Sequence, residues 1–215
     1  MKKYFLLLLF FVIAAIAVQA QYTFVFLHKK ADAEVLPKEK VDELMKGHMS
    51  NIDRLAQEGK LLVAGPFEGG GGIFILNTKS KEEAELWLST DPGIQAKRWN
   101  VEVLPYKVTA GKLCKATEPY EMVTYVFLRY DAIVSKFNAG TYPEIMNKHN
   151  EYVKQLTKGG NVITTGAFGE QDGGIVIMRG DVEKAVIDAD PGVQEALLEV
   201  TQKKLWIAKG SFCEE

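Results

Sequence analysis

Residues 22–28 have the composition of a strand, and the residues after them change to a helical spacing. Residues 22–28 are rich in β-branched and aromatic side chains, which is typical of a strand. Residues 37–58 instead place apolar side chains three or four positions apart, which predicts an amphipathic helix. The apolar positions of this helix are Val41, Leu44, Met45, Ile52 and Leu55. Gly59 follows directly, as expected for a residue that ends a helix in the left-handed conformation.

The next fifty residues continue with two short strands, a second helix and a last strand. The strands are predicted over 61–64 and 73–76, and we interpret the glycines at 69–72 between them as a hairpin turn rather than a phosphate-binding loop, since no helix follows. Ser80 and Glu83 form a capping box that opens the second helix. Asp91-Pro92 closes that helix, and residues 101–108 make the last strand. The predicted order, β-α-β-β-α-β, is that of a ferredoxin-like unit.

The second half of the chain repeats the first. Six short blocks recur in the same order, at an offset of 101 residues early in the unit and of 99 residues late in it. The clearest pairs are 23–27 with 124–128, His48 with His149, Gly65 with Gly166, 64–67 with 165–168, 91–93 with 190–192, and 111–114 with 210–213. We interpret the chain as a tandem duplication with a first repeat at 21–108, a linker at 109–122 and a second repeat at 123–213.

Two such units have a reason to pack together. In each, both helices would cover one face of a four-stranded sheet and leave the other face bare. If the two bare faces pack against each other, one chain forms the arrangement that usually takes two. The expected fold class is therefore α+β, with two ferredoxin-like βαββαβ repeats pairing as an intrachain dimeric α/β-barrel.

The first twenty residues have the features of a secretory signal peptide. Two lysines precede an apolar run from Tyr4 to Val18, and small residues occupy the expected −3 and −1 positions, Val18 and Ala20. The alternative is a transmembrane anchor, but the run is shorter than the roughly 20 apolar residues that span a bilayer. We expect residues 1–20 to be removed, which leaves no stable membrane anchor and places the protein in the periplasm or outside the cell.

Composition narrows the classes of function. The 215 residues include 26 basic and 28 acidic side chains, and 47% are apolar, as in an ordinary globular protein. The net charge of −2 argues against nucleic acid as a partner, because phosphate binding needs a basic surface. Only two cysteines and three scattered histidines are present, without the spacing of a metal site, so no metal and no cofactor is expected. The expected partner is a small molecule, and further oligomerisation stays open.

His48 and His149 are the candidate chemical groups. Each lies on the apolar stripe of its predicted helix and should point inward. A histidine on an apolar face is more often a core residue than a catalyst, although its presence in both repeats weakens that interpretation. Asp91 and Asp190 each precede Pro-Gly, and proline favours an extended backbone at the preceding residue. If the carboxylate reaches the histidine, it orients the ring and favours its protonated form.

Each half resembles the YciI-like (YCII-related) family. The resemblance rests on the helical histidine, on Gly-Lys-Leu-Leu-Val-Ala-Gly-Pro at 59–66 and on the helix that ends in Asp-Pro. It implies a dimeric α/β-barrel with a pocket between the sheet and the first helix, at which we place Gly65, Pro66 and Gly166. It also implies catalytic pairs, which are His48 with Asp91 and His149 with Asp190.

The resemblance implies acid–base chemistry, because one similar enzyme is a dehydrochlorinase that acts on a chlorinated hydroxyquinone. We therefore expect an exported enzyme that catalyses proton transfer, elimination or isomerisation on a small organic molecule. The alternative is a binding or structural protein that has the fold without turnover. Gly166-Ala167 replaces Gly65-Pro66 in the second half, which is one departure from the family pattern.

Cys114 and Cys213 occupy equivalent positions, each three residues after a glycine and just beyond the last strand of its repeat. In an exported protein these positions are compatible with a disulfide. Two free or intermolecular thiols are the alternative. The tryptophans Trp87, Trp99 and Trp206 are expected in the core or in a pocket wall.

Overall fold

The computed structural model describes residues 21–116, 118–169 and 172–214. The predicted signal peptide, residues 1–20, lies outside this part of the chain. Within the described residues, no helix combines the length and the apolar character that crossing a membrane requires.

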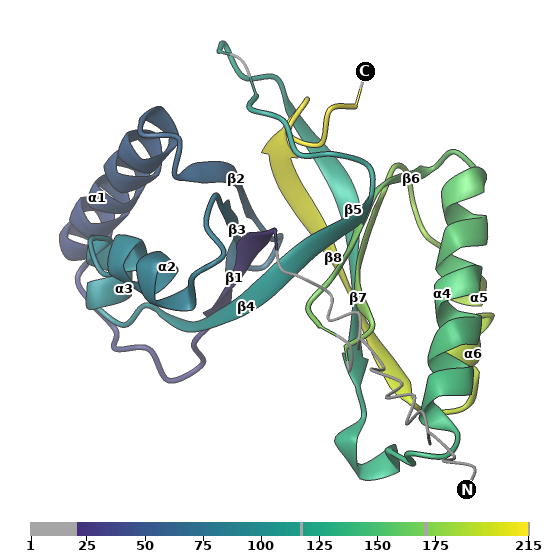
Figure 1. The fold of residues 1–215 in the computed structure, drawn as a ribbon. Coiled ribbons are helices and arrows are strands. Elements are labelled where there is room, and N and C mark those ends of the chain that lie inside the picture. Colours follow the sequence, from purple (N-terminus) through teal and green to yellow (C-terminus); the bar gives the residue numbers. More distant parts are fainter. Residues whose placement is uncertain (1–20, 117, 170–171, 215) are drawn as a thin grey trace, which may run out of the picture.

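The two halves of the chain have the same order of strands and major helices (Figure 1). The first half contains β1 (Tyr22–Lys29), α1 (Lys38–Gln57), β2 (Leu61–Pro66), β3 (Gly72–Leu76), α2 (Lys81–Leu88), α3 (Pro92–Gln95) and β4 (Trp99–Ala110). The second half contains β5 (Met122–Ala132), η1 (Val134–Lys136), α4 (Tyr142–Lys158), β6 (Val162–Ala167), β7 (Gly174–Met178), α5 (Lys184–Asp188), α6 (Pro191–Gln194) and β8 (Leu198–Ala208). The one-turn helices α3 and α6 were not predicted, because proline was expected only to end the preceding helix.

All eight strands belong to one antiparallel sheet in the order β2-β3-β1-β4-β6-β7-β5-β8. Each half contributes four neighbouring strands in the ferredoxin-like order. The halves are joined where β4 pairs with β6, with Lys107 opposite Ala167 and Val108 opposite Gly166. At the other side, Phe67 forms a bridge with Leu205, and the N–H of Glu68 donates to the Lys204 carbonyl at 3.0 Å. The sheet thus curves back on itself, which confirms the expected barrel-like α+β fold.

The helices lie outside this barrel on opposite sides. Figure 1 shows α1, α2 and α3 on one side of the strands and α4, α5 and α6 on the other. The interior contains apolar side chains from both halves, and eight of the buried ones are aromatic. They are Phe24, Phe26, Phe67, Tyr106, Tyr125, Phe127, Phe168 and Phe212, together with aliphatic residues. A separate apolar cluster fills the space between each half-sheet and its own helices.

The glycines at 69–72 form the tight end of a hairpin. The backbone φ angles of Gly69, Gly70 and Gly71 are +85°, +104° and +77°, in a region that side chains disfavour. The N–H of Phe67 donates to the Gly71 carbonyl across the turn at 3.0 Å. The hairpin interpretation is therefore confirmed.

One strand register differs between the halves, and one tryptophan differs from the expectation. In the first half Gly72 pairs with Leu27, whereas in the second half Gly174 pairs with Tyr130, two positions beyond the residue that the sequence repeat matches to Leu27. Trp206 is 51% exposed, not buried, because it lies on the outward face of β8 next to the inward-facing Leu205.

Candidate functional site

The Asp-Pro-Gly segments fix both carboxylates by local backbone chemistry. Asp91 is the N-cap of α3, with an extended backbone (φ −83°, ψ 120°) imposed by Pro92 at the first helical position. Its Oδ1 accepts hydrogen bonds from the N–H groups of Gly93 and Ile94, at 2.8 and 3.1 Å. Asp190 caps α6 in the same way, and its Oδ1 accepts from Gly192 N–H at 2.7 Å. Capping uses one oxygen of each carboxylate and leaves the other free.

The second oxygen of each carboxylate meets a histidine. Oδ2 of Asp91 lies 2.7 Å from Nδ1 of His48, and Oδ2 of Asp190 lies 2.8 Å from Nδ1 of His149. All four side chains are buried, and both carboxylates are completely inaccessible. The structure therefore brings together each of the two predicted pairs, which come from a long helix and from a helix cap about 40 residues later.

The electrostatics of the first pair favour an ionised carboxylate. Burial raises the pKa of Asp91, but the hydrogen bond from His48, its charge and the N–H groups of Ile94 and Gly93 outweigh burial and lower that pKa below its ordinary value. Asn51 adds a longer hydrogen bond, with its Nδ2 donating to Oδ2 of Asp91 at 3.3 Å. An ionised Asp91 can only accept a hydrogen bond, so it favours a proton on the Nδ1 atom of His48 that faces it.

The two histidines differ at their other ring nitrogen. Nε2 of His48 has no hydrogen-bond partner within the described residues, while the ring packs against Trp99 with centroids 4.8 Å apart. Nε2 of His149 lies 3.2 Å from the carbonyl oxygen of Gly173. Since that oxygen only accepts, Nε2 of His149 must carry a proton to make this bond. Nε2 of His48 thus has no partner among the described residues, whereas both ring nitrogens of His149 have one.

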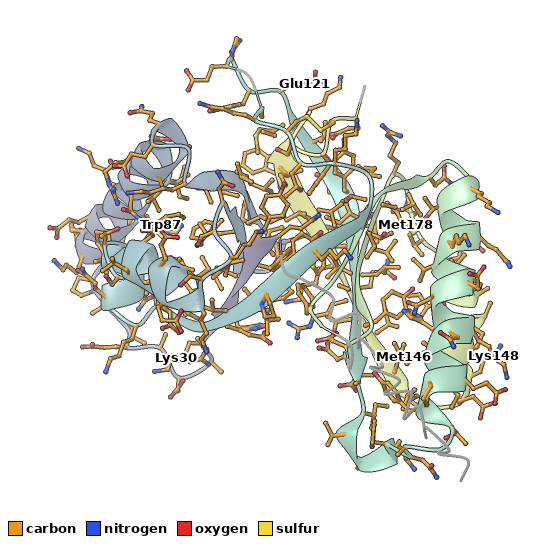
Figure 2. All side chains as sticks on the ribbon, in the orientation of Figure 1. Lys30, Trp87, Glu121, Met146, Lys148 and Met178 are labelled. Atoms are coloured by element: carbon orange, nitrogen blue, oxygen red, sulfur yellow. A yellow bond between two sulfur atoms is a disulfide. The ribbon has the colours of Figure 1, made fainter. Side chains whose placement is uncertain are left out.

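A cavity of about 830 Å³ lies beside His149. It is bounded by α4, by β6 and β7, and by the end of β4, so both halves of the chain form it. Figure 2 shows Met146, one of its lining residues, on the sheet-facing side of α4, whereas Lys148 points to the opposite side. Sequence reasoning missed most of these lining residues, because they converge only when the two halves pair.

Asp172 is a further carboxylate in this cavity that the sequence analysis did not single out. Its Oδ1 accepts from the N–H of Gly174 at 3.0 Å. Burial raises the pKa of Asp172, and the Asp131 and Glu102 carboxylates act in the same direction, against the Gly174 hydrogen bond and the charge of Arg129. Asp172 is therefore a second titratable group close to the His149 pair.

The three expected pocket residues have different positions. Gly166 lines the cavity and lies under the ring of Tyr106, where an added Cβ would be 2.1 Å from Cε2. Gly65 is its counterpart in the first half and lies against the backbone of Trp206, whose carbonyl oxygen would be 2.8 Å from a Cβ. Pro66 is exposed at the end of β2 and does not line the cavity beside His149. The two glycines thus allow the strands of the two halves to approach closely.

Cys114 and Cys213 form a disulfide, with Cα atoms 5.1 Å apart. The bond links the connection after β4 to the end of the chain, and a backbone hydrogen bond from Cys114 N–H to the Ser211 carbonyl, 2.9 Å, runs beside it. Within the described residues, no group of three or more His, Cys, Asp and Glu side chains is placed to hold a metal ion.

Solved structures with a similar fold have very different sequences. A proposed monooxygenase from Fusobacterium nucleatum subsp. nucleatum is 9% identical, with a TM-score of 0.47 over 87% of this chain and 92% of that one. A proposed chlorite dismutase is 10% identical, with a TM-score of 0.46 over 87% of this chain and 93% of that one. No curated protein matches the sequence.

The comparison with protein families concerns the first half of the chain. Residues 22–107 match the YCII-related domain. This range begins with β1, contains His48 and Asp91, and ends within β4. Residues 22–107 are therefore similar to the YCII-related domain, and this match covers less than half of the chain.

Proposed function

We propose that the protein is an exported acid–base enzyme that acts on a small organic molecule through its His–Asp pairs. The observation that carries the proposal is the pair of buried His–carboxylate contacts, at 2.7 and 2.8 Å, on equivalent elements of the two halves. Buried ionisable pairs are costly to maintain for packing alone, and histidine is the side chain suited to proton transfer near neutral pH.

The proposal assigns one role to the carboxylates and another to the rings. Asp91 and Asp190 hold Nδ1 of each ring and fix its orientation without entering the reaction. Nε2 of His48 is then available to accept a proton from a substrate. Nε2–H of His149 donates a proton once a substrate group replaces the Gly173 carbonyl as its partner. The reaction class is proton transfer, elimination or isomerisation.

The proposal includes the origin and destination of the chain. The common element order, the two capped Asp-Pro-Gly segments and the matched cysteines support a tandem duplication of one YCII-related unit. The basic and apolar start of the sequence supports a signal peptide over residues 1–20, and a disulfide between distant positions fits an oxidising compartment.

A binding protein without turnover is the second candidate. The observation that favours it is the complete engagement of His149, which is 1% exposed and has partners at both ring nitrogens. In this case the pairs would hold the helices to their caps, and the cavity would bind a ligand without changing it.

A screen of small metabolites by thermal shift, followed by product analysis, separates the two candidates. A ligand at 100 times its Kd stabilises a protein by roughly 2.7 kcal/mol, so true ligands raise the melting temperature measurably. The enzyme proposal predicts that at least one ligand is converted by the wild type and not by His149→Asn or His48→Asn. Ligands that bind and are recovered unchanged would favour the binding protein.

A further inference from the structure

The cavity beside His149 has a charged side that the pairs do not explain. Among the lining residues that the structure describes are three lysines, Lys107 from β4 and Lys154 and Lys158 from α4, and one carboxylate, that of Asp172. Lys107 and Lys158 form no ion pair with any described residue, whereas Lys154 lies 3.2 Å from exposed Glu151. In the described part of the lining, positive side chains therefore outnumber negative ones, although the chain as a whole is acidic.

The cavity lining also has an apolar part. Six residues from α4, β7 and the segment before α4 provide aromatic and aliphatic surface, namely Phe137, Tyr142, Met146, Val153, Ile175 and Val176. Small-molecule sites commonly combine such a wall with a few charged groups that fix orientation. A ligand that satisfies both sides has an apolar or aromatic body and a negatively charged group.

The lysines are not a requirement of the fold. At the repeat offsets of 99 and 101 residues, the counterparts of Lys107, Lys154 and Lys158 in the other half are Trp206, Asp53 and Gln57. The His–Asp geometry is the same in both halves, but the charge around it differs. The lysines are therefore specific to the cavity beside His149 and are not repeated at the equivalent positions around His48.

We propose that this cavity binds a small organic anion, with its carboxylate or phosphate group between Lys107 and Lys158 and its apolar body against α4 and β7. The inference refines the proposed function by naming its ligand class, and it rests on that function only through the shared cavity. Binding can be measured without turnover, so the failure of one does not imply the failure of the other.

Isothermal titration with three probes of similar shape tests the proposal. The probes are 2-naphthoate, 1-naphthyl phosphate and the neutral 2-naphthamide. At least one anion should bind with a Kd below about 1 mM, at least tenfold more tightly than the amide, and the stronger anion identifies the preferred head group. Equal binding of the amide, or no saturable binding of either anion, would overturn the proposal.

Variants assign the binding to the lysines. Lys107→Gln combined with Lys158→Gln should weaken anion binding about tenfold or more, since each partly exposed charge pair contributes modestly. Lys148→Gln is the matched control, because Lys148 is on the same helix, points away from the cavity and pairs with Glu144 at 2.7 Å. It should bind like the wild type. Unchanged binding by the double variant would contradict the assignment.

Two further measurements keep the test decisive. If the double Gln variant does not fold, Lys107→Arg with Lys158→Arg should retain binding, and the wild-type Kd should rise with salt as electrostatic attraction is screened. A salt-independent Kd would count against the proposal.

Discussion

Asp91 and Asp190 each perform two structural tasks with one carboxylate. One oxygen caps a one-turn helix and the other holds a histidine on a different helix. A residue that binds both partners fixes the distance between them, so the ring cannot turn away without breaking the cap. At the scale of single residues, this double contact determines where Nε2 of each histidine points.

Removal of the Asp91 carboxylate should be costly. Asp91→Ala leaves His48 and two cap N–H groups without their partner in a buried position, and we expect a loss of about 3–5 kcal/mol in the free energy of unfolding. Asp91→Asn keeps an oxygen for the cap and should lose less. Urea denaturation at pH 7 measures both, and an Asp91→Ala variant as stable as Asp91→Asn would contradict this account.

The stability contribution of Asp91 should depend on pH in one direction. Its pKa is lower in the folded state than in the unfolded chain, where it is about 3.9. The stabilisation by the ionised Asp91 carboxylate is therefore complete above the unfolded-state pKa, and it is lost as the pH falls through the lower pKa of the folded state. The difference in unfolding free energy between wild type and Asp91→Asn should shrink below about pH 4. A difference that grows on acidification would show that the sign is wrong.

At the scale of elements, close approach of strands from the two halves determines the barrel. Val108 pairs with Gly166, and the buried ring of Tyr106 lies over that glycine. The corresponding contact joins Gly65 to Leu205, with a Cβ–Cδ1 distance of 3.0 Å if Gly65 carried a side chain. Because both positions are glycine, β6 can lie directly against β4, and β2 directly against β8.

Gly166→Ala should destabilise the protein by about 1–3 kcal/mol or more, because the new Cβ would overlap a buried ring. The matched control is Gly140→Ala in an exposed loop, where a Cβ meets only the Asn138 side chain at 3.3 Å. In a Tyr106→Leu background, which introduces the residue type found in the other half, Gly166→Ala should cost less. An equal cost in both backgrounds, measured by urea denaturation, would contradict the contact.

At the scale of the whole molecule, the barrel is closed by noncovalent and covalent contacts between the halves. The β4–β6 pairing and the Phe67–Leu205 bridge join the sheet, and the disulfide ties the connection between the halves to the end of the second half. The cavity beside His149 depends on this pairing, because Lys107 and Thr109 come from the first half.

The disulfide should contribute strongly to stability. It spans 99 residues, and restriction of an unfolded chain of that length is worth on the order of 4–5 kcal/mol in the chain-entropy model. Cys114→Ser with Cys213→Ser should lower the urea midpoint and make it insensitive to reductant. The wild-type midpoint should fall to the same value in reductant, and a wild type unaffected by reductant would contradict the role of the bond.

Much of this architecture was predictable from local patterns, and the rest depends on tertiary packing. Helical spacing placed His48 on an inward face, and the Asp-Pro pair indicated an extended backbone at the aspartate, but not that the aspartate caps a further helix. The Gly173 carbonyl at His149 was not predictable, because it is a backbone contact between distant segments. The lysines of the cavity were not predicted either, because they come from β4 of one half and α4 of the other and share a cavity only in the folded chain.

The most direct test of the central claim is turnover by a variant that keeps the packing of both pairs but cannot transfer protons. In His48→Asn with His149→Asn, the amide N–H replaces Nδ1 beside each aspartate, and Nε2 is absent. With a substrate found by the screen, the account predicts a loss of turnover of about 10²-fold or more, a nearly unchanged melting temperature, and normal turnover in the control His28→Gln, whose residue lies outside both pairs. Wild-type turnover by the double variant would contradict the central claim.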